Sequence, residues 1–201
     1  MKVKDLMISN PITIGPRSSI SKAIELMKKN SIRHLPVVTK GKILKGFITL
    51  SDLKQGLVPS MLEDITFSDL IIKKPITVHP EDYIDIAAQL IYKYKIGGMP
   101  VVDKGKVVGI ITESDILRAF IDMMGLLHNS SRIDVVIGDK PGLLRKAIHI
   151  IQDNKGEILS LSLASPNSPN KLHYFRLSPC KIQKIKKALE QEGFEVTASR
   201  D

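Results

Sequence analysis

An internal duplication is the sequence feature that most restricts how this chain can fold. Residues 3–44 align with residues 67–108, and after a shift of one position residues 46–53 align with residues 109–116. Nearly half of the aligned positions carry the same residue in both copies, which chance does not produce over such a length. Because a copy of about 50 residues has little apolar surface to enclose alone, we expect the two copies to stack face to face and share a core.

The first half of each copy predicts an extended entry followed by a helix. The entry is Pro-Ile-Thr in both copies, and proline with β-branched residues disfavours helix there. Apolar residues then recur at helical spacing, which indicates one buried helix face. We expect Ser18 and Asp82 to cap these helices. The apolar positions are Ile20, Ala23, Ile24 and Met27 in the first copy and Ile84, Ala87, Ala88 and Ile91 in the second.

The second half of each copy predicts two short strands and a closing helix. The turn between the strands is Lys-Gly-Lys in both copies, where Gly41 and Gly105 permit a positive φ. The closing helices are expected to start near Ser51 and Ser114, so that each copy has the order β-α-β-β-α. The strands are expected at 35–38 and 43–49, and at 99–102 and 107–112.

The most informative string in each copy joins the last strand to the closing helix. It carries Thr49, Ser51 and Asp52 in the first copy, and Thr112, Ser114 and Asp115 in the second. An ionised aspartate accepts hydrogen bonds from adjacent ribose hydroxyls, and the free N–H groups of a helix start attract a phosphate. The same Thr-x-x-Asp spacing is also a capping box, in which both side chains satisfy backbone donors. The residues alone leave both interpretations open.

The repeats resemble a tandem pair of cystathionine-β-synthase (CBS) domains, also called a Bateman module. The matching elements are Asp-Leu, Pro-Ile-Thr, the segment from Ile32 to Val38, and Gly-x-x-Thr-x-Ser-Asp. The likeness covers residues 1–127, with one repeat over 1–60 and the other over 61–127. Members of that family bind AMP, ADP, ATP or S-adenosylmethionine in two clefts between the repeats. The resemblance therefore implies a regulatory adenosyl ligand and no catalysis.

The resemblance also implies roles for individual residues. Asp52 and Asp115 would hold ribose hydroxyls, with the neighbouring threonines and serines near the ribose or phosphate. The adenine and the cleft walls would be contacted by Thr13, Thr77, Pro36 and Pro100.

The two copies differ at one position that matters for phosphate. Arg33 and His34 of the first copy are replaced by Gly97 and Gly98 in the second. The planar fork of Arg33 can grip a phosphate, and His34 can add charge when protonated. Arg118 is a further candidate phosphate ligand. We therefore expect two sites of unequal phosphate affinity.

A second domain is predicted over residues 128–201. Its strands are expected at 132–137, 157–163, 172–177 and 194–198, and its helices at 143–154 and from Ile182 to Gly193, in the ferredoxin-like order βαββαβ. A hairpin loop is expected at 165–170. The fold class is therefore α+β: two β-α-β-β-α repeats paired about a pseudo-twofold axis, followed by this domain.

The string Asp-Lys-Pro-Gly-Leu-Leu, followed by Gly156-Glu-Ile158, resembles an ACT domain. Such modules form dimers and often bind amino acids, which implies a homodimer and a candidate amino-acid site at Asp139, Pro141, Gly142 and Leu143. The asparagine that is common in this family before the isoleucine is Glu157 here. A CBS pair followed by an ACT domain is similar to the acetoin-utilisation protein B family.

Composition narrows the other classes of function. The net charge is +9, but the basic residues are spread along the chain instead of forming one basic segment. Aromatic residues make up 4% of the chain and include no tryptophan, so few side chains can stack on nucleic-acid bases. The sequence shows no metal-ligand spacing and no catalytic motif. Cys180 is the only cysteine and no apolar run spans a bilayer, which favours the cytoplasm. A structural dimerisation module without ligand and a DNA-associated regulator stay as alternatives.

Overall fold

The structure is a computed structural model that describes residues 1–55, 65–126, 129–164 and 171–200. The expected hairpin loop at 165–170 lies outside the described residues. The chain divides into two compact units, residues 1–117 and residues 118–201, and the point of division lies within a helix. Within the described residues no helix has the length and apolar character needed to cross a membrane.

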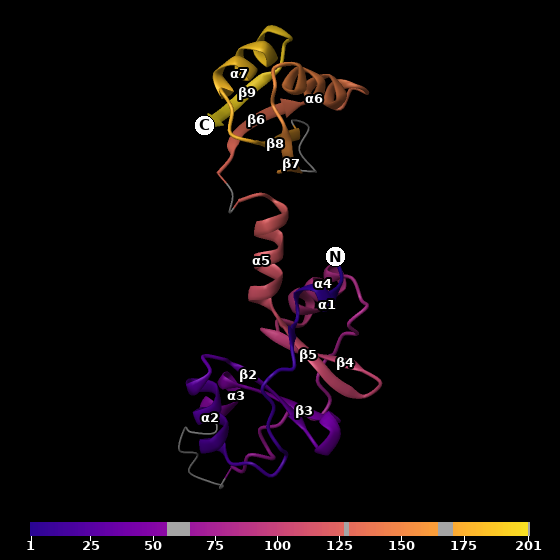
Figure 1. The fold of residues 1–201 in the computed structure, drawn as a ribbon, viewed down its shortest axis with the longest axis vertical. Helices are drawn as coiled ribbons and strands as arrows, with labels where there is room; N and C mark the ends of the chain where they lie inside the picture. Colours follow the sequence, from indigo (N-terminus) through magenta and orange to yellow (C-terminus); the bar gives the residue numbers. More distant parts are fainter. Residues whose placement is uncertain (56–64, 127–128, 165–170, 201) are drawn as a thin grey trace. The chain divides into compact units, whose positions relative to one another are not determined.

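The unit of residues 1–117 contains the two hairpin strands and the helices expected in each repeat, with the last helix running beyond it (Figure 1). The Pro-Ile-Thr entries, expected as the first strand of each repeat, form no strand; only isolated bridges follow them, at Ile14 and Val78. Its strands form a sheet of order β1-β5-β4 and a separate pair β2-β3, all antiparallel. Gly41 and Gly105 occupy the turns with φ of 80° and 78°, as expected. The elements are α1 (Val3–Leu6), β1 (Ile8–Ser9), α2 (Ile20–Lys29), β2 (His34–Val38), η1 (Lys40–Lys42), β3 (Leu44–Thr49), α3 (Leu50–Gln55), α4 (Ile84–Tyr94), β4 (Gly98–Asp103), β5 (Lys106–Thr112) and α5 (Glu113–Met123).

The caps of α2 and α4 differ from the sequence prediction. Ser19, not Ser18, caps α2 and accepts a hydrogen bond from the backbone N–H of Lys22 at 3.2 Å. The cap position of α4 is Tyr83, because the carboxylate of Asp82 accepts from the N–H of His79 at 2.7 Å. Asp82 therefore closes the turn that precedes the helix, and this local bond competes with a cap.

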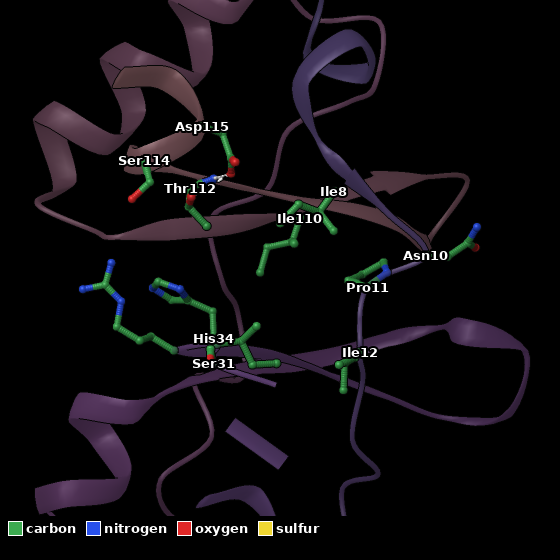
Figure 2. A pocket seen from close by; sticks show the side chains of 12 residues that line it. Ile8, Asn10, Pro11, Ile12, Ser31, His34, Ile110, Thr112, Ser114 and Asp115 are labelled. Carbon is green, nitrogen blue, oxygen red and sulfur yellow. Dashed lines mark hydrogen bonds between the residues drawn. The ribbon is translucent and has the colours of Figure 1, made fainter. Parts of the chain in front are cut away.

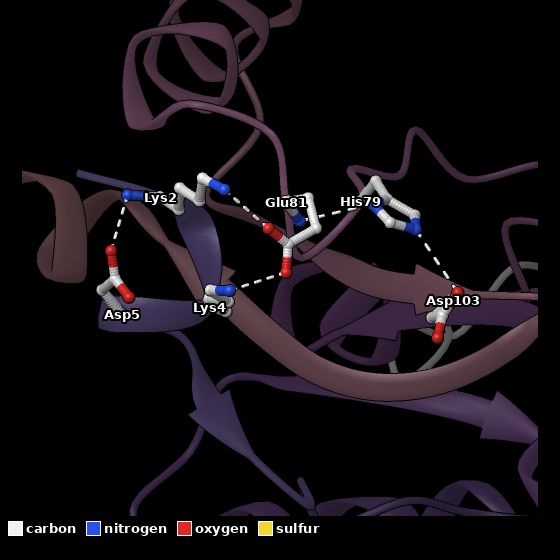
Figure 3. A network of polar contacts seen from close by, with 6 residues as sticks. All are labelled: Lys2, Lys4, Asp5, His79, Glu81 and Asp103. Carbon is white, nitrogen blue, oxygen red and sulfur yellow. Dashed lines mark hydrogen bonds and ion pairs between the residues drawn. The ribbon is translucent and has the colours of Figure 1, made fainter.

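The repeats exchange their leading segments. The segment before the first repeat lies on the second: β1 pairs with β5, and the N–H of Val3 donates to the carbonyl of Asp82 at 2.8 Å. Lys2 and Lys4 both form ion pairs with Glu81 at 2.7 Å, and these pairs also hold the leading segment against the second repeat (Figure 3). In return, Ile72 of the second repeat pairs with Phe47 of β3.

Each repeat consequently has its own core, not the single shared core that the sequence suggested. One cluster joins Met27, Leu35 and Ile48 to Phe67, a residue of the second repeat's leading segment. The other joins Met99 and Ile111 to Val3, from the first repeat's leading segment. The exchanged segments complete the two cores and hold the repeats together.

Two equivalent glycines make room for these exchanged segments. A Cβ on Gly46 would lie 2.3 Å from a methyl of Ile71 and 2.8 Å from the carbonyl oxygen of Ile72. A Cβ on Gly109 would lie 2.4 Å from the sulfur of Met7. Close backbone approach therefore accounts for a glycine at this position of both repeats.

The unit of residues 118–201 has the expected order of elements, β-α-β-β-α-β. Its four strands form an antiparallel sheet of order β7-β8-β6-β9, and α6 and α7 cover one face of it (Figure 1). The core between helices and sheet includes Ile133, Val135, Phe175, Ile185 and Leu189, all fully buried. The elements are β6 (Ser131–Ile137), α6 (Leu143–Asp153), β7 (Ile158–Leu163), β8 (Lys171–Leu177), α7 (Ile182–Gln191) and β9 (Glu195–Arg200).

The edge strand β7 is less buried than its alternating sequence suggests. Leu161 and Leu163 pair with Phe175 and His173, which places them on the helix-covered face, yet both leucines are exposed. Leu159 is the extra residue of a bulge and is also exposed. Because α6 and α7 lie over the central strands, the apolar face of the edge strand stays open to solvent.

Candidate functional site

Both aspartates at the closing helix starts form capping boxes. Asp52 Oδ2 accepts from the backbone N–H of Thr49 at 2.9 Å and from its hydroxyl at 2.7 Å. Asp115 Oδ2 accepts from the N–H and hydroxyl of Thr112 at 2.8 and 2.6 Å. The structure therefore confirms that Oδ2 of each aspartate serves the capping box, and the O–H of each threonine is used up in a hydrogen bond to that oxygen. In each aspartate Oδ1 accepts no hydrogen bond from the described residues, so one acceptor is left for a ligand.

A cleft of about 350 Å³ lies beside Asp115 (Figure 2). We call it the Asp115 cleft. Thr112, Ser114 and Asp115 come from the second repeat, and His34 stands on the opposite wall, from the first repeat. The wall between them is apolar and is formed by Ile8, Pro11, Ile12, Ile32 and Ile110. The volume falls in the range of small-molecule sites, so there is room for a purine nucleoside alongside the carboxylate.

A second cleft, of about 470 Å³, lies beside Asp52 at the equivalent position of the other repeat. We call it the Asp52 cleft. Thr49, Ser51 and Asp52 line it together with the exchanged residue Ile72. Its wall is more charged, with three cations and two carboxylates among the lining residues: Arg33, Lys54, Lys95, Asp52 and Glu113.

Arg33 and His34 line both clefts. The guanidinium of Arg33 lies 4.0 Å from the carboxylate of Glu113, which belongs to the second repeat. The ring of His34 stacks on Phe47 with centroids 5.7 Å apart. Burial, and then the charge of Arg33, lower the pKa of His34 below its ordinary value of 6.5. The ring is therefore neutral near pH 7 and adds no charge there, unlike Arg33.

Other residues predicted for the site do not line either cleft. Thr13, Pro36, Thr77, Pro100 and Arg118 are absent from both sets of lining residues. Arg118 lies 4.0 Å from Asp122, one turn further along α5, which is a solvated pair on the helix surface. Pro36 and Pro100 pair instead with Phe47 and Ile110 inside the two sheets.

The candidate amino-acid residues lie together at the start of α6. Gly142 is the cap residue of α6, with φ of 89°, and has no side chain to close the helix start. Asp139 forms an ion pair with Lys171, and Leu143 packs against the core. Glu157 accepts a hydrogen bond from the hydroxyl of Ser178 at 2.7 Å.

Sequence reasoning missed several lining residues. Lys54, Lys95 and Glu113 are charged in one copy only, so the comparison of the repeats did not mark them. Ile8 and Ile72 are identical in both copies, and that identity was the signal for them. Within the described residues, no group of three or more histidine, cysteine, aspartate or glutamate side chains gathers as a metal site would require.

Comparison with known proteins agrees with the arrangement of the repeats. Residues 3–58 and 67–122, more than half of the chain, match the family model of the CBS domain. The chain belongs to the CBS-domain family. Among curated relatives, the L-aspartate semialdehyde sulfurtransferase of Methanocaldococcus jannaschii is 37% identical over 119 residues. That match covers 59% of this chain and 23% of the relative, so the chain spans about a quarter of that protein's length.

Solved structures of CBS pairs resemble the same part of the chain. The CBS domain pair of protein MJ0100, in complex with 5′-methylthioadenosine and S-adenosyl-L-methionine, is 36% identical with a TM-score of 0.56, over 60% of this chain and 95% of that one. A provisionally assigned acetoin utilization protein (AcuB) from Vibrio cholerae is 31% identical with a TM-score of 0.55, over 63% and 94%. CBSX2 in complex with AMP is 28% identical with a TM-score of 0.53, over 60% and 96%.

Proposed function

We propose that this protein is a non-catalytic sensor that binds adenosine-containing ligands in the Asp52 and Asp115 clefts. The observation that carries the proposal is the same in both clefts: a helix-start aspartate keeps Oδ1 uncommitted beside a space large enough for a nucleoside. A ribose hydroxyl would donate to that oxygen. Similar CBS pairs have been solved with AMP, S-adenosylmethionine and methylthioadenosine, which supports this class of ligand.

The two clefts would prefer different adenosyl ligands: one that carries a phosphate and one that carries a sulfur group. Lys54 and Lys95 make the Asp52 cleft the better place for a phosphate, and Arg33 can turn toward it from its weak pair with Glu113. The largely apolar Asp115 cleft suits an adenosyl group that carries a thioether instead of a phosphate. In both, Ser51 and Ser114 would supplement the donors at the helix start.

We further propose that the C-terminal part of the chain is an ACT-like domain that forms a dimer. The strand order β7-β8-β6-β9 with two helices on one face is the order that a ferredoxin-like βαββαβ domain would have, which supports assigning residues 128–201 to an ACT-like domain. The domain would mediate a cytoplasmic homodimer and could hold an amino acid at the start of α6. The likeness to AcuB fits this architecture, while the regulated partner and pathway are left unassigned.

Titration calorimetry of the full chain with AMP, ATP and S-adenosylmethionine tests the sensor proposal. We expect saturable heats with at least one of them, at up to two sites per chain. If none gives saturable heat, the sensor proposal fails and a dimerisation module without ligand is left. A gel shift with DNA that weakens steeply with salt would instead favour the DNA-associated regulator.

A further inference from the structure

The uncovered face of the C-terminal sheet carries a row of arginines. In the strand register, Arg132 of β6 stands opposite Arg176 of β8 on one side and opposite Arg200 of β9 on the other. Ser160 of β7 continues the row beyond Arg176. Residues directly opposite in a sheet share a face, so all four point to the side away from α6 and α7.

Such a row is unfavourable without an anion. Like charges directly opposite each other destabilise a sheet, and the row contains two such pairs. Only Arg132 has a carboxylate partner among the described residues: the buried Asp134, which it contacts at 2.7 and 2.8 Å. Arg176 donates to the neutral hydroxyl of Ser130 at 2.8 Å. Arg176 and Arg200 are therefore not neutralised within the described part of the chain.

A small cavity opens over this row. It measures about 120 Å³ and is lined by Arg132, Arg176, Ser160, Ser162 and Tyr174, with Met124 and Leu126 at its rim. The bidentate pair with Asp134 fixes Arg132, and a bond of 2.9 Å from Ser160 to the carbonyl of Met124 fixes the rim. The cavity exceeds the roughly 30 Å³ of a water in the liquid severalfold, but is smaller than the about 300 Å³ at which nucleoside-sized pockets begin.

We propose that this cavity binds a dianionic phosphate, free or at the end of a small molecule, between Arg132, Arg176 and the hydroxyl of Ser162. The N–H groups that Arg132 does not use on Asp134, the remaining N–H groups of Arg176 and the hydroxyl of Ser162 supply the converging donors that a tetrahedral oxyanion accepts. Of the two arginines without a carboxylate partner among the described residues, Arg176 lines the cavity, and Arg200 stands at the end of the row and adds positive charge nearby. A nucleic acid fits less well, because Tyr174 is the only aromatic residue that lines the cavity and the guanidinium of Arg132 already lies over one face of its ring at 4.4 Å.

Calorimetry with inorganic phosphate, at constant ionic strength, tests this site in the full chain. Arg176→Gln should weaken phosphate binding about tenfold or more, as expected for the loss of a charge-assisted hydrogen bond. Lys187→Gln removes the same charge from the exposed surface of α7 and should leave phosphate binding unchanged. Unchanged circular dichroism and melting temperature would show that both variants fold.

Two further variants probe the charge balance without removing a donor to the cavity. Arg200→Gln, at the exposed end of β9, should weaken binding by a smaller factor than Arg176→Gln. Asp134→Asn frees Arg132 from its carboxylate and should tighten phosphate binding. Glycerol phosphate distinguishes free phosphate from a monoester, and a single-stranded oligonucleotide distinguishes both from a polyanion.

The proposal is overturned if phosphate shows no saturable binding to the native chain, or if Arg176→Gln binds it as tightly as Lys187→Gln does. It is also overturned if the oligonucleotide binds while neither phosphate nor glycerol phosphate does. Saturation by either small phosphate that is lost in Arg176→Gln and kept in Lys187→Gln supports it.

Discussion

Removal of the aspartate from one capping box at a time separates the ligand role from the structural role. Asp52 and Asp115 each use Oδ2 for the box and present Oδ1 to a cleft. Asp69 makes the same two bonds within a turn instead of at a helix start: it accepts from the N–H of Thr66 at 3.0 Å and from its hydroxyl at 2.5 Å, and it lines neither cleft. Asp69→Ala is therefore a matched control.

The expected magnitudes follow from the bonds that each change removes. One hydrogen bond to a charged acceptor contributes about 1.5–3 kcal/mol, so Asp52→Ala and Asp115→Ala should each weaken nucleoside binding in their own cleft by about 10- to 100-fold. Loss of a helix cap lowers the free energy of unfolding by about 1 kcal/mol in Asp52→Ala and Asp115→Ala, and loss of the equivalent turn bonds should lower it in Asp69→Ala as well. Asp69→Ala should therefore lower stability without changing ligand affinity.

Calorimetry with AMP and with S-adenosylmethionine measures the affinities, and thermal denaturation measures the stabilities. The reasoning is refuted if Asp69→Ala weakens binding as much as the cleft variants do, since the effect would then come from the loss of stability alone. It is equally refuted if Asp52→Ala and Asp115→Ala together leave the affinities unchanged.

Three more predictions concern packing and pH. Gly46→Ala should lower the free energy of unfolding by about 1–3 kcal/mol, and by more than Gly109→Ala does. A Cβ on Gly46 would lie 2.8 Å from the backbone carbonyl oxygen of Ile72, whereas a Cβ on Gly109 would lie 3.2 Å from that of Ile8 and otherwise meet the flexible side chain of Met7. Gly15→Ala, with 3.8 Å of clearance, is the control in urea denaturation. Because the pKa of His34 is lowered in the folded chain, the unfolded chain binds a proton on this ring at a higher pH than the folded chain does. The free energy of unfolding should therefore fall as pH drops below about 6.5, and this fall should be smaller in His34→Asn. Lys2 and Lys4 lower the pKa of Glu81 to about 2, so its contribution should be lost as pH falls from 4.5 toward 2, and Glu81→Gln or high salt should remove this dependence.

Elements that depend on local chemistry were predictable from the sequence. The hairpin strands of both repeats begin and end within one or two residues of the predicted positions, because the turn glycines and the apolar spacing mark them directly. The entry strands expected at Pro-Ile-Thr did not form. The capping boxes at Thr49 and Thr112 were also visible as a spacing. The caps of α2 and α4 were harder to predict. Ser18 and Ser19 are both suitable cap residues for α2, and only the geometry selects Ser19. At α4, Asp82 bonds to His79 instead of capping the helix.

Features that depend on tertiary pairing were not predictable. Nothing in the sequence places Val3 in the core of the second repeat and Phe67 in that of the first, because the exchange is decided by which strands pair. The same exchange brings Ile8 and Ile72 into the clefts. The neutral state of His34 depends on burial and on Arg33, which a sequence pattern does not report.

The arginine row of the C-terminal sheet illustrates the same limit. Arg132, Arg176 and Arg200 are widely spaced in the sequence, and only the antiparallel register brings them side by side. The alternation of β7 was read correctly as a strand, but its leucines are exposed because coverage by α6 and α7 is a property of the packed domain.

A crystal structure of the chain grown with AMP tests the central claim most directly. The account predicts a nucleotide in the Asp52 cleft, with a ribose hydroxyl within hydrogen-bonding distance of Oδ1 of Asp52 while Oδ2 keeps its bonds to Thr49. A structure in which both clefts hold only water at saturating AMP would contradict it, and so would a bound nucleotide whose ribose contacts neither Asp52 nor Asp115.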